Sequence, residues 1–417
     1  MTSRCWVGAM LALAGCGGGG TTEIGTAGVV NPRCGDGVVF VPVRVSAPFG
    51  WIPEICDEGA ANGTAASFCT PYCQNGQAKI TEVASYTLPK LAQHLLASDH
   101  MAGGEAVVTW DDDDVTVVVG LDETPRTISL RVAAPPSGVA LSPVVEPEGG
   151  QKVVWMERHS DEAGATKIYV ADVAVEPPVI TELGGYPAGY PFPDAAGGVL
   201  VRPIDSRLAV LDVSRDATPE LLVAAYDFTS SIWTEQERMG PLPGATQVSA
   251  VMRGGETAVE WNLLRTFSGP SSYALDELRG TADLGPRGPL DGVPVAASFG
   301  SFDEANETQP IVLFDDGTIV FQEPDLSWTV FGQVPAGTHT LGVLSVAGGR
   351  LDDVVVLRDD GVLSVLVNDG DGQAMAAQDF PIFETPGPVA LAADFDTVWV
   401  SAGTSYKILT VTQEGLR

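Results

Sequence analysis

Ile311-Val-Leu-Phe-Asp-Asp-Gly-Thr-Ile-Val-Phe321 and Val355-Val-Leu-Arg-Asp-Asp-Gly-Val-Leu-Ser-Val365 follow one pattern: a β-rich run, an Asp-Asp-Gly turn and a second β-rich run. The second copy comes 44 residues after the first. Asp-Gly between two such runs is typical of a hairpin, because the tight turn needs a residue with positive φ, which glycine adopts easily. Each copy therefore predicts a β-hairpin, and their spacing predicts a structural repeat.

A weaker copy supports the same period. Val389–Phe395 occupies the place that Gly342–Val346 has about 47 residues earlier. A repeat of roughly 40 to 50 residues made of short strands is the pattern of a β-propeller blade. The 340 residues from 78 to 417 would hold about seven blades of that size. We therefore predict an all-β fold, a β-propeller of about seven blades over residues 77–417, preceded by a small disulfide-rich segment.

Composition agrees with many short strands joined by tight turns. The 48 glycines and 30 prolines are spread among short Val, Ile and Leu runs. Further blades are expected around these runs: Ala106–Val119, Val153–Val173, Val199–Val213 and Leu221–Val251.

The two ends of this body are expected to meet. A closed ring must join its last blade to its first, and Ala78–Leu88 alternates well enough to supply an outer strand to the blade ending in Tyr406–Val411. The best helical pattern is Leu88–Met101. A pair of β-sandwiches is the alternative architecture, and the 44-residue repeat argues against it.

The N-terminus has the pattern of a secretion signal. Arg4 is the only charged residue before Glu23, and it precedes the apolar run Trp6–Ala14. That run is too short to span a bilayer, which takes about 20 apolar residues. The sequence Leu13-Ala-Gly-Cys16 overlaps the end of this apolar run.

This ending resembles the lipobox of bacterial lipoproteins. The resemblance implies that residues 1–15 are removed, that Cys16 is acylated, and that the membrane is a partner through this anchor. Gly17 stands where an aspartate would favour retention in the inner membrane, so we expect an outer-membrane lipoprotein on the periplasmic or surface face. Residues 16–33 are then the acylated cysteine and a glycine-rich, flexible tether.

Four cysteines remain for the exported chain once Cys5 leaves with the signal and Cys16 is acylated. An even number close together in an oxidising compartment predicts two disulfides, with three pairings open. These cysteines are Cys34, Cys56, Cys69 and Cys73.

Their surroundings, Cys34-Gly-Asp-Gly, Cys56-Asp-Glu-Gly and Cys69-Thr-Pro-Tyr-Cys, resemble the myxobacterial disulfide repeat over residues 34–76, with an insertion at Phe40–Ile52. Zinc on the thiolates is an alternative that suits an exported chain poorly, and calcium is an alternative on the nearby acids Asp36, Glu54, Asp57 and Glu58.

The charge is strongly acidic, with 22 Lys and Arg against 54 Asp and Glu, a net −32. Nucleic acids and anionic lipid headgroups are therefore excluded as expected partners, because their binding depends on cationic clusters. Asp111–Asp114 is the densest acidic run and predicts a hairpin tip, with calcium binding as the alternative.

Val346–Val367 resembles the FG-GAP/VCBS repeat, a propeller blade with a calcium loop. Of that loop the chain keeps only the final acids, Asp352 and Asp353, while Asp394 and Asp396 keep an opening pair. Asn368–Gly372 is interpreted as a turn with the look of a calcium-loop fragment. No cofactor is expected from these residues, and calcium stays an open alternative.

Catalytic motifs are missing from the sequence. The four histidines are His94, His100, His159 and His339, and none belongs to a metal or nucleophile motif. His159 with Glu157, Asp161 and Glu162 is a candidate polar patch. The leading hypothesis is a noncatalytic envelope protein whose propeller binds a protein or glycan. The alternative is a propeller hydrolase or lyase with its site at the central channel.

Overall fold

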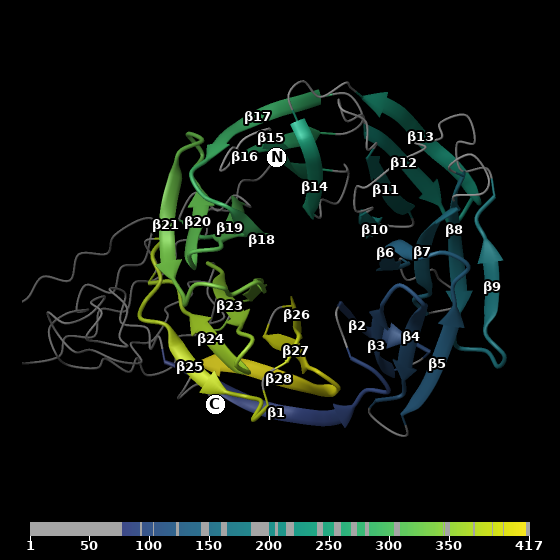
Figure 1. Ribbon diagram of the computed structural model, residues 1–417, viewed down its shortest axis with the longest axis horizontal. Helices are drawn as coiled ribbons and strands as arrows, with labels where there is room; N and C mark the ends of the chain where they lie inside the picture. Colours follow the sequence, from purple (N-terminus) through teal and green to yellow (C-terminus); the bar gives the residue numbers. More distant parts are fainter. Residues whose placement is uncertain are drawn as a thin grey trace, which may run out of the picture.

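The computed structural model describes residues 77–413, with gaps at 92–93, 103, 122–124, 143–149, 160–164, 185–199, 205–206, 214–220, 240–244, 254–259, 268–272, 280–282, 304–308, 345, 347–350, 370–371, 386 and 395. The described elements are all β-strands, arranged in seven antiparallel sheets of four strands each. The sheets stand around a central axis as the blades of a closed ring (Figure 1). The chain is a seven-bladed β-propeller, as the repeat length predicts.

Blades 1 to 3 follow one another along the chain. Blade 1 contains β2 (Leu95–Met101), β3 (Gly104–Trp110), β4 (Asp114–Val119) and β5 (Arg126–Arg131). Blade 2 contains β6 (Pro136–Leu141), β7 (Val153–His159), β8 (Ala165–Asp172) and β9 (Val179–Glu182). Blade 3 contains β10 (Leu200–Ile204), β11 (Arg207–Val213), β12 (Leu221–Asp227) and β13 (Ile232–Met239).

Blades 4 to 6 continue in the same order. Blade 4 contains β14 (Ala245–Arg253), β15 (Glu260–Phe267), β16 (Tyr273–Arg279) and β17 (Asp283–Leu290). Blade 5 contains β18 (Pro294–Gly300), β19 (Gln309–Phe314), β20 (Thr318–Gln322) and β21 (Trp328–Gln333). Blade 6 contains β22 (Gly342–Leu344), β23 (Asp353–Leu357), β24 (Val362–Leu366) and β25 (Gln378–Pro381).

Blade 7 is built from both ends of the described chain. It contains β26 (Val389–Asp394), β27 (Thr397–Ala402) and β28 (Ser405–Gln413), with β1 (Ala78–Thr87) as its outer strand. β1 pairs antiparallel with β28 from Ala78 opposite Gln413 to Thr87 opposite Ser405, with an irregularity between Glu82 and Ala84. This pairing confirms the predicted closure, and the blue and yellow strands lie side by side in Figure 1.

The repeated Asp-Asp-Gly turns are hairpins between the second and third strands of blades 5 and 6. β19 pairs with β20, and β23 pairs with β24. Gly317 and Gly361 have φ of 86° and 82°, so the turn uses the conformation that glycine supplies. The 44-residue repeat is therefore one blade.

The hydrophobic core lies between the blades, and β23 shows how the sequence produces it. Successive side chains of a strand point to opposite faces of the sheet. Val355 and Leu357 pack toward blade 7, whereas Val354 and Val356 pack toward blade 5. Both faces are buried, so the middle strands are continuous apolar runs without polar alternation.

Two sequence-based predictions are wrong in detail. Leu88–Met101 is not a helix: its second half is β2, the innermost strand of blade 1. Val199–Val213 and Leu221–Val251 do not mark two separate blades, because β10 to β13 form a single sheet and the second range runs on into β14 of the next. Within the residues described here, the structure has no helix long and apolar enough to span a membrane.

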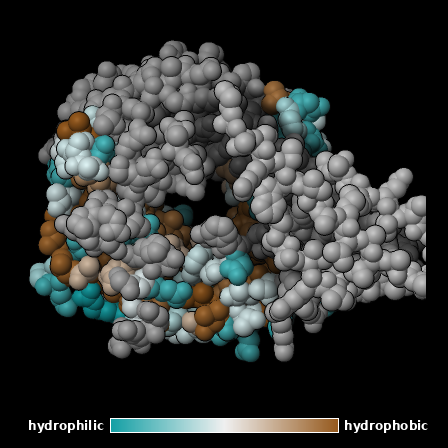
Figure 2. Space-filling view, turned by 180° about the vertical axis from the view of Figure 1, so that it is seen from behind, coloured by the Kyte–Doolittle hydropathy of each residue, from teal (hydrophilic) through white to brown (hydrophobic). Residues whose placement is uncertain are grey.

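The ring has two rims, which differ in the chain connections that they carry. We call one the connector face: it carries the links from each outer strand to the next blade and the turns between the second and third strands of each blade. The opposite rim, which carries the other turns, is the return face. Because β1 pairs in register with β28, Ala78 lies at the return face and Thr87 at the connector face. Seen from behind, the described surface mixes hydrophilic and hydrophobic residues around a central opening (Figure 2).

Candidate functional site

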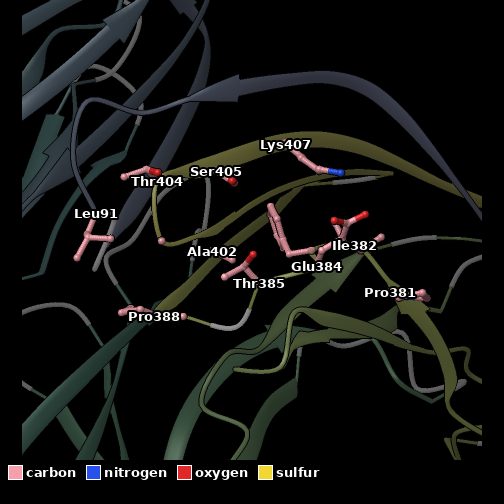
Figure 3. Close-up of a pocket in the computed structure, with 13 residues that line it drawn as sticks. Leu91, Pro381, Ile382, Glu384, Thr385, Pro388, Ala402, Thr404, Ser405 and Lys407 are labelled. Carbon is pink, nitrogen blue, oxygen red and sulfur yellow. The ribbon is translucent and has the colours of Figure 1, made fainter.

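A groove of about 860 Å³ lies on the connector face where blade 7 meets blade 6 (Figure 3). Three segments form it: the connector from β25 to β26, the turn from β27 to β28, and the start of the connector from β1 to β2. The groove has the size of a small-ligand or peptide site. Its lining residues are Leu91, Pro381, Ile382, Phe383, Glu384, Thr385, Gly387, Pro388, Ala402, Gly403, Thr404, Ser405 and Lys407.

Backbone hydrogen bonds hold the three segments together. The Gly403 amide donates to the Pro388 carbonyl at 2.9 Å, and the Leu88 amide donates to the Thr404 carbonyl at 2.7 Å. Gly403 has a φ of 61°, which lets the two-residue turn close. The turn from β27 to β28 is thus hydrogen-bonded to both connectors. These backbone hydrogen bonds hold the walls of the groove in place.

The groove combines an aliphatic wall with a small number of charged groups. Leu91 is 52% exposed, and a Cβ on Gly403 would lie 3.7 Å from its Cδ2, so the leucine lies over the turn. Lys407 donates to Glu82 at 2.8 Å and lies 5.6 Å from the centroid of the Phe383 ring. Phe383 is itself 8% exposed, so the lysine and the connector cover this aromatic.

Glu384 is the carboxylate of the groove lining. It is exposed, and no described residue donates a hydrogen bond to it or pairs with it. In contrast, Lys407 already has an acidic partner. The groove therefore presents an available negative charge beside an aliphatic surface.

The predicted hairpin tip Asp111–Asp114 also lies on the connector face. The carboxylate of Asp111 accepts hydrogen bonds from the amides of Asp113 and Asp114 at 2.9 and 3.1 Å. Lys90, one residue before the groove residue Leu91, pairs with Asp111 at 2.8 Å and also with Asp114.

Partial burial opposes ionisation of Asp111, but these hydrogen bonds and the Lys90 charge outweigh it and leave the pKa of the carboxyl below its ordinary value. Two of the four acids of this tip therefore hold an ammonium group.

His94 extends the same surface. Its ring stacks on Trp110 with centroids 4.9 Å apart, and burial lowers the pKa of the imidazole. His339 is exposed on the connector between blades 5 and 6. The two described histidines thus lie on different connectors, and the side chains of His100 and His159 lie outside the described residues.

Two acids of the calcium-loop resemblance, Asp352 and Asp353, accept hydrogen bonds from backbone amides. Asp353 is 2% exposed and accepts hydrogen bonds from the amides of Val346 and Asn368, each at 2.7 Å. Asp352 accepts from the Ser301 amide at 2.8 Å, and burial raises the pKa of its carboxyl. Among the described residues, no group of three or more His, Cys, Asp or Glu side chains is placed to hold a metal.

Asp353→Ala is expected to destabilise the propeller by about 3 kcal/mol or more, because two buried amides lose a charged acceptor. Asp353→Asn keeps one carbonyl oxygen and should cost less. The midpoint of urea unfolding measures both effects, with Asp359→Asn on the exposed turn as the matched control. Equal stability of Asp353→Ala and the parent would contradict the structural role.

Glu157, from the proposed polar patch, is also structural. It is 2% exposed and accepts hydrogen bonds from the Trp155 indole at 2.7 Å and the Ala133 amide at 3.2 Å. Asp161 and Glu162 lie outside the described residues. The described side chains of the inner strands β2, β6, β18, β22 and β26 are apolar, small or hydroxyl-bearing and include no titratable group.

Cys16 and the four cysteines of the neck, Cys34, Cys56, Cys69 and Cys73, lie outside the described residues, as do the tether and the N-terminal segment. The acylation and disulfide predictions therefore stay predictions. The groove was not predicted from the sequence. No sequence motif distinguishes the connector 381–388 from the other Pro- and Gly-containing links between blades.

Comparisons with known proteins give structural similarity without a family. No protein-family model matches the sequence, and no curated protein matches it. Similar solved structures include BBS1N in complex with ARL6DN, at 11% identity and a TM-score of 0.49 over 80% of this chain and 95% of that one.

A chain of the mitotic checkpoint complex is 14% identical, with a TM-score of 0.48 over 79% of this chain and 94% of that one. PorZ, a bacterial surface component of the type-IX secretion system of Porphyromonas gingivalis, is 11% identical, with a TM-score of 0.46. The PorZ match covers 80% of this chain and 39% of PorZ.

Proposed function

We propose that this chain is a lipoprotein of the bacterial outer membrane, acylated at Cys16, whose propeller binds a protein or glycan partner without catalysing a reaction. The observation that carries the binding role is the groove on the connector face, which joins the first and last strands of the ring. The lipobox-like ending before Cys16 supports the anchor. Two disulfides among Cys34, Cys56, Cys69 and Cys73 would staple the short segment between tether and ring, because a segment of this size buries little apolar surface.

The direction of β1 determines on which face the chain enters the propeller. The chain enters the ring through Ala78 at the return face, while the groove opens on the connector face. The anchored N-terminal segment would thus attach on one side of the propeller and leave the groove on the other. A partner would reach the groove without displacing the anchor.

Photo-crosslinking in cells tests the proposal. A photoreactive amino acid replacing Thr404, an exposed groove residue, should form an adduct with a partner when Cys16 is intact. Cys16→Ser should abolish palmitate labelling, leave the signal uncleaved and reduce the adduct at least tenfold, because the chain no longer reaches its membrane.

The same photoreactive residue at Asp396, an exposed position at the return face of the same blade, is the matched control. Palmitate labelling of the Cys16→Ser chain would overturn the anchor. Adducts of equal yield from both positions would overturn the connector face as the binding face.

A further inference from the structure

We infer that the groove binds an extended segment of a partner protein in which a bulky apolar side chain is followed closely by a lysine or arginine. This inference rests on the proposed binding role and names the class of partner and the residues that recognise it. Leu91 supplies the apolar contact and Glu384 the charge contact.

The aliphatic wall favours a peptide over a sugar. Leu91 is 52% exposed, and Pro388 and Ile382 add further apolar side chains to the groove lining. Exposed apolar area in a concave site is a common mark of a partner-binding surface. An aliphatic or aromatic side chain of a peptide would remove this area from water, which favours binding.

The aromatic in the lining argues in the same direction. Stacking on the face of an aromatic ring requires that the face be open. Phe383 is 8% exposed and carries the Lys407 ammonium 5.6 Å from its centroid, so its face is occupied. Among the described lining residues no other aromatic is present. A sugar would find hydroxyl partners here but no ring to stack on.

The charges select a basic residue over an acidic one. Lys407 is neutralised by Glu82 at 2.8 Å, whereas Glu384 has no described partner. A ligand carboxylate near Lys407 would compete with Glu82 and meet Glu384, but a ligand ammonium or guanidinium can pair with Glu384 directly. The net charge of −32 also draws a basic segment toward the protein at long range.

Hydroxyl side chains of the groove can bind the main chain of the peptide segment. Thr385, Thr404 and Ser405 place exposed hydroxyls along the groove, as Figure 3 shows, and each hydroxyl both donates and accepts. An extended peptide presents alternating amides and carbonyls, and such hydroxyls match them without regard to sequence. Selectivity would then come from the Leu91 and Glu384 contacts.

Selection from a random dodecapeptide library displayed on phage tests the inference, with the full chain held in detergent micelles. Enriched peptides should share a bulky apolar residue within three positions of a lysine or arginine. Leu91→Ser should weaken their binding at least tenfold, since the apolar contact is lost. Glu384→Lys should weaken it at least tenfold and, in a fresh selection, enrich acidic peptides instead.

Two control variants are matched in chemistry but lie outside the groove. Val83→Ser removes a side chain that is 60% exposed on β1, and Asp396→Lys reverses an exposed acid at the return face. Both should bind the enriched peptides as the parent does. Thermal unfolding of every variant shows that the fold is retained.

Three results would overturn the inference: no enriched motif, enriched peptides that bind Leu91→Ser and the parent equally, or binding of soluble oligosaccharides that Leu91→Ser abolishes. The last result would identify a glycan site. The cell crosslink at Thr404 is independent of peptide chemistry. An adduct there without peptide binding would reject this inference and leave the proposed function standing.

Discussion

Ending the chain at Val400 is expected to abolish cooperative folding of the whole propeller, although only 17 of 417 residues are removed. The cut deletes β28, which is the hydrogen-bonding partner of both β1 and β27. It also removes four large side chains of the hydrophobic core that are 0 or 1% exposed: Tyr406, Ile408, Leu409 and Val411.

Each such side chain contributes roughly 1.5–3 kcal/mol by burial, and a domain has about 5–15 kcal/mol in total. The ring would lose most of that margin at once. Thermal unfolding followed by circular dichroism should show a broad transition or none. The control is a chain ending at Gln413, which keeps β28 complete and should melt as the parent does. A sharp transition in the shorter chain would contradict closure by this strand.

Gly317→Ala is expected to be among the most destabilising single substitutions, by about 3 kcal/mol or more. Gly317 has a φ of 86°, and a Cβ built on it would lie 2.0 Å from the Val334 carbonyl oxygen. That oxygen belongs to the connector leaving blade 5, which also donates from the Val334 amide to the Gly317 carbonyl at 2.9 Å. Relief of the clash would require breaking the turn away from its connector.

Gly337→Ala separates backbone strain from the clash. Gly337 has a φ of 82°, but a Cβ there meets nothing within 4 Å. The strain of positive φ alone costs about 1–2 kcal/mol. Guanidinium unfolding midpoints of the two variants should therefore differ clearly, with Gly317→Ala the lower. Equal midpoints would show that the turn and its connector are free to separate.

The sequence was sufficient for the architecture because the repeat is local. Asp315–Gly317 and Asp359–Gly361 occupy the same turn in consecutive blades, so their spacing reports the blade length directly. Closure of the ring was predictable too, because the strand Ala78–Thr87 precedes the first complete blade and has no partner strand next to it in the sequence. The blade repeat and the closure were both inferred from short sequence patterns and from the requirement that a propeller ring must close.

The wrong helix at Leu88–Met101 has a physical cause. Leu95 packs toward blade 7 and Leu96 toward blade 2, since the inner strand is buried on both faces. Apolar neighbours on opposite faces, together with Leu91 and Met101, give a spacing that a helix would also satisfy. Periodicity cannot separate the two cases when no face is left to water.

The groove lay beyond sequence reasoning for a different reason. Leu91 and Glu384 belong to two connectors and Thr404 to a hairpin turn, and the three segments meet only after the ring closes. None belongs to a catalytic or metal motif. The acids that did attract attention, Asp353 and Glu157, proved to be buried acceptors for backbone and indole donors.

β1 is synthesised long before β28, the strand with which it pairs to close the ring. β1 leaves the ribosome before any other strand that the structure describes, yet Glu82 meets Lys407 325 residues later. Closing a loop of that length costs about 5 kcal/mol of chain entropy plus a constant. Until β28 is made, β1 has no partner strand in its blade, and its free edge can pair with strands of other molecules. Its charged residues, Lys79 and Glu82, make such mispairing less favourable. Closing the ring therefore requires the last strand of the propeller to dock with its first described strand.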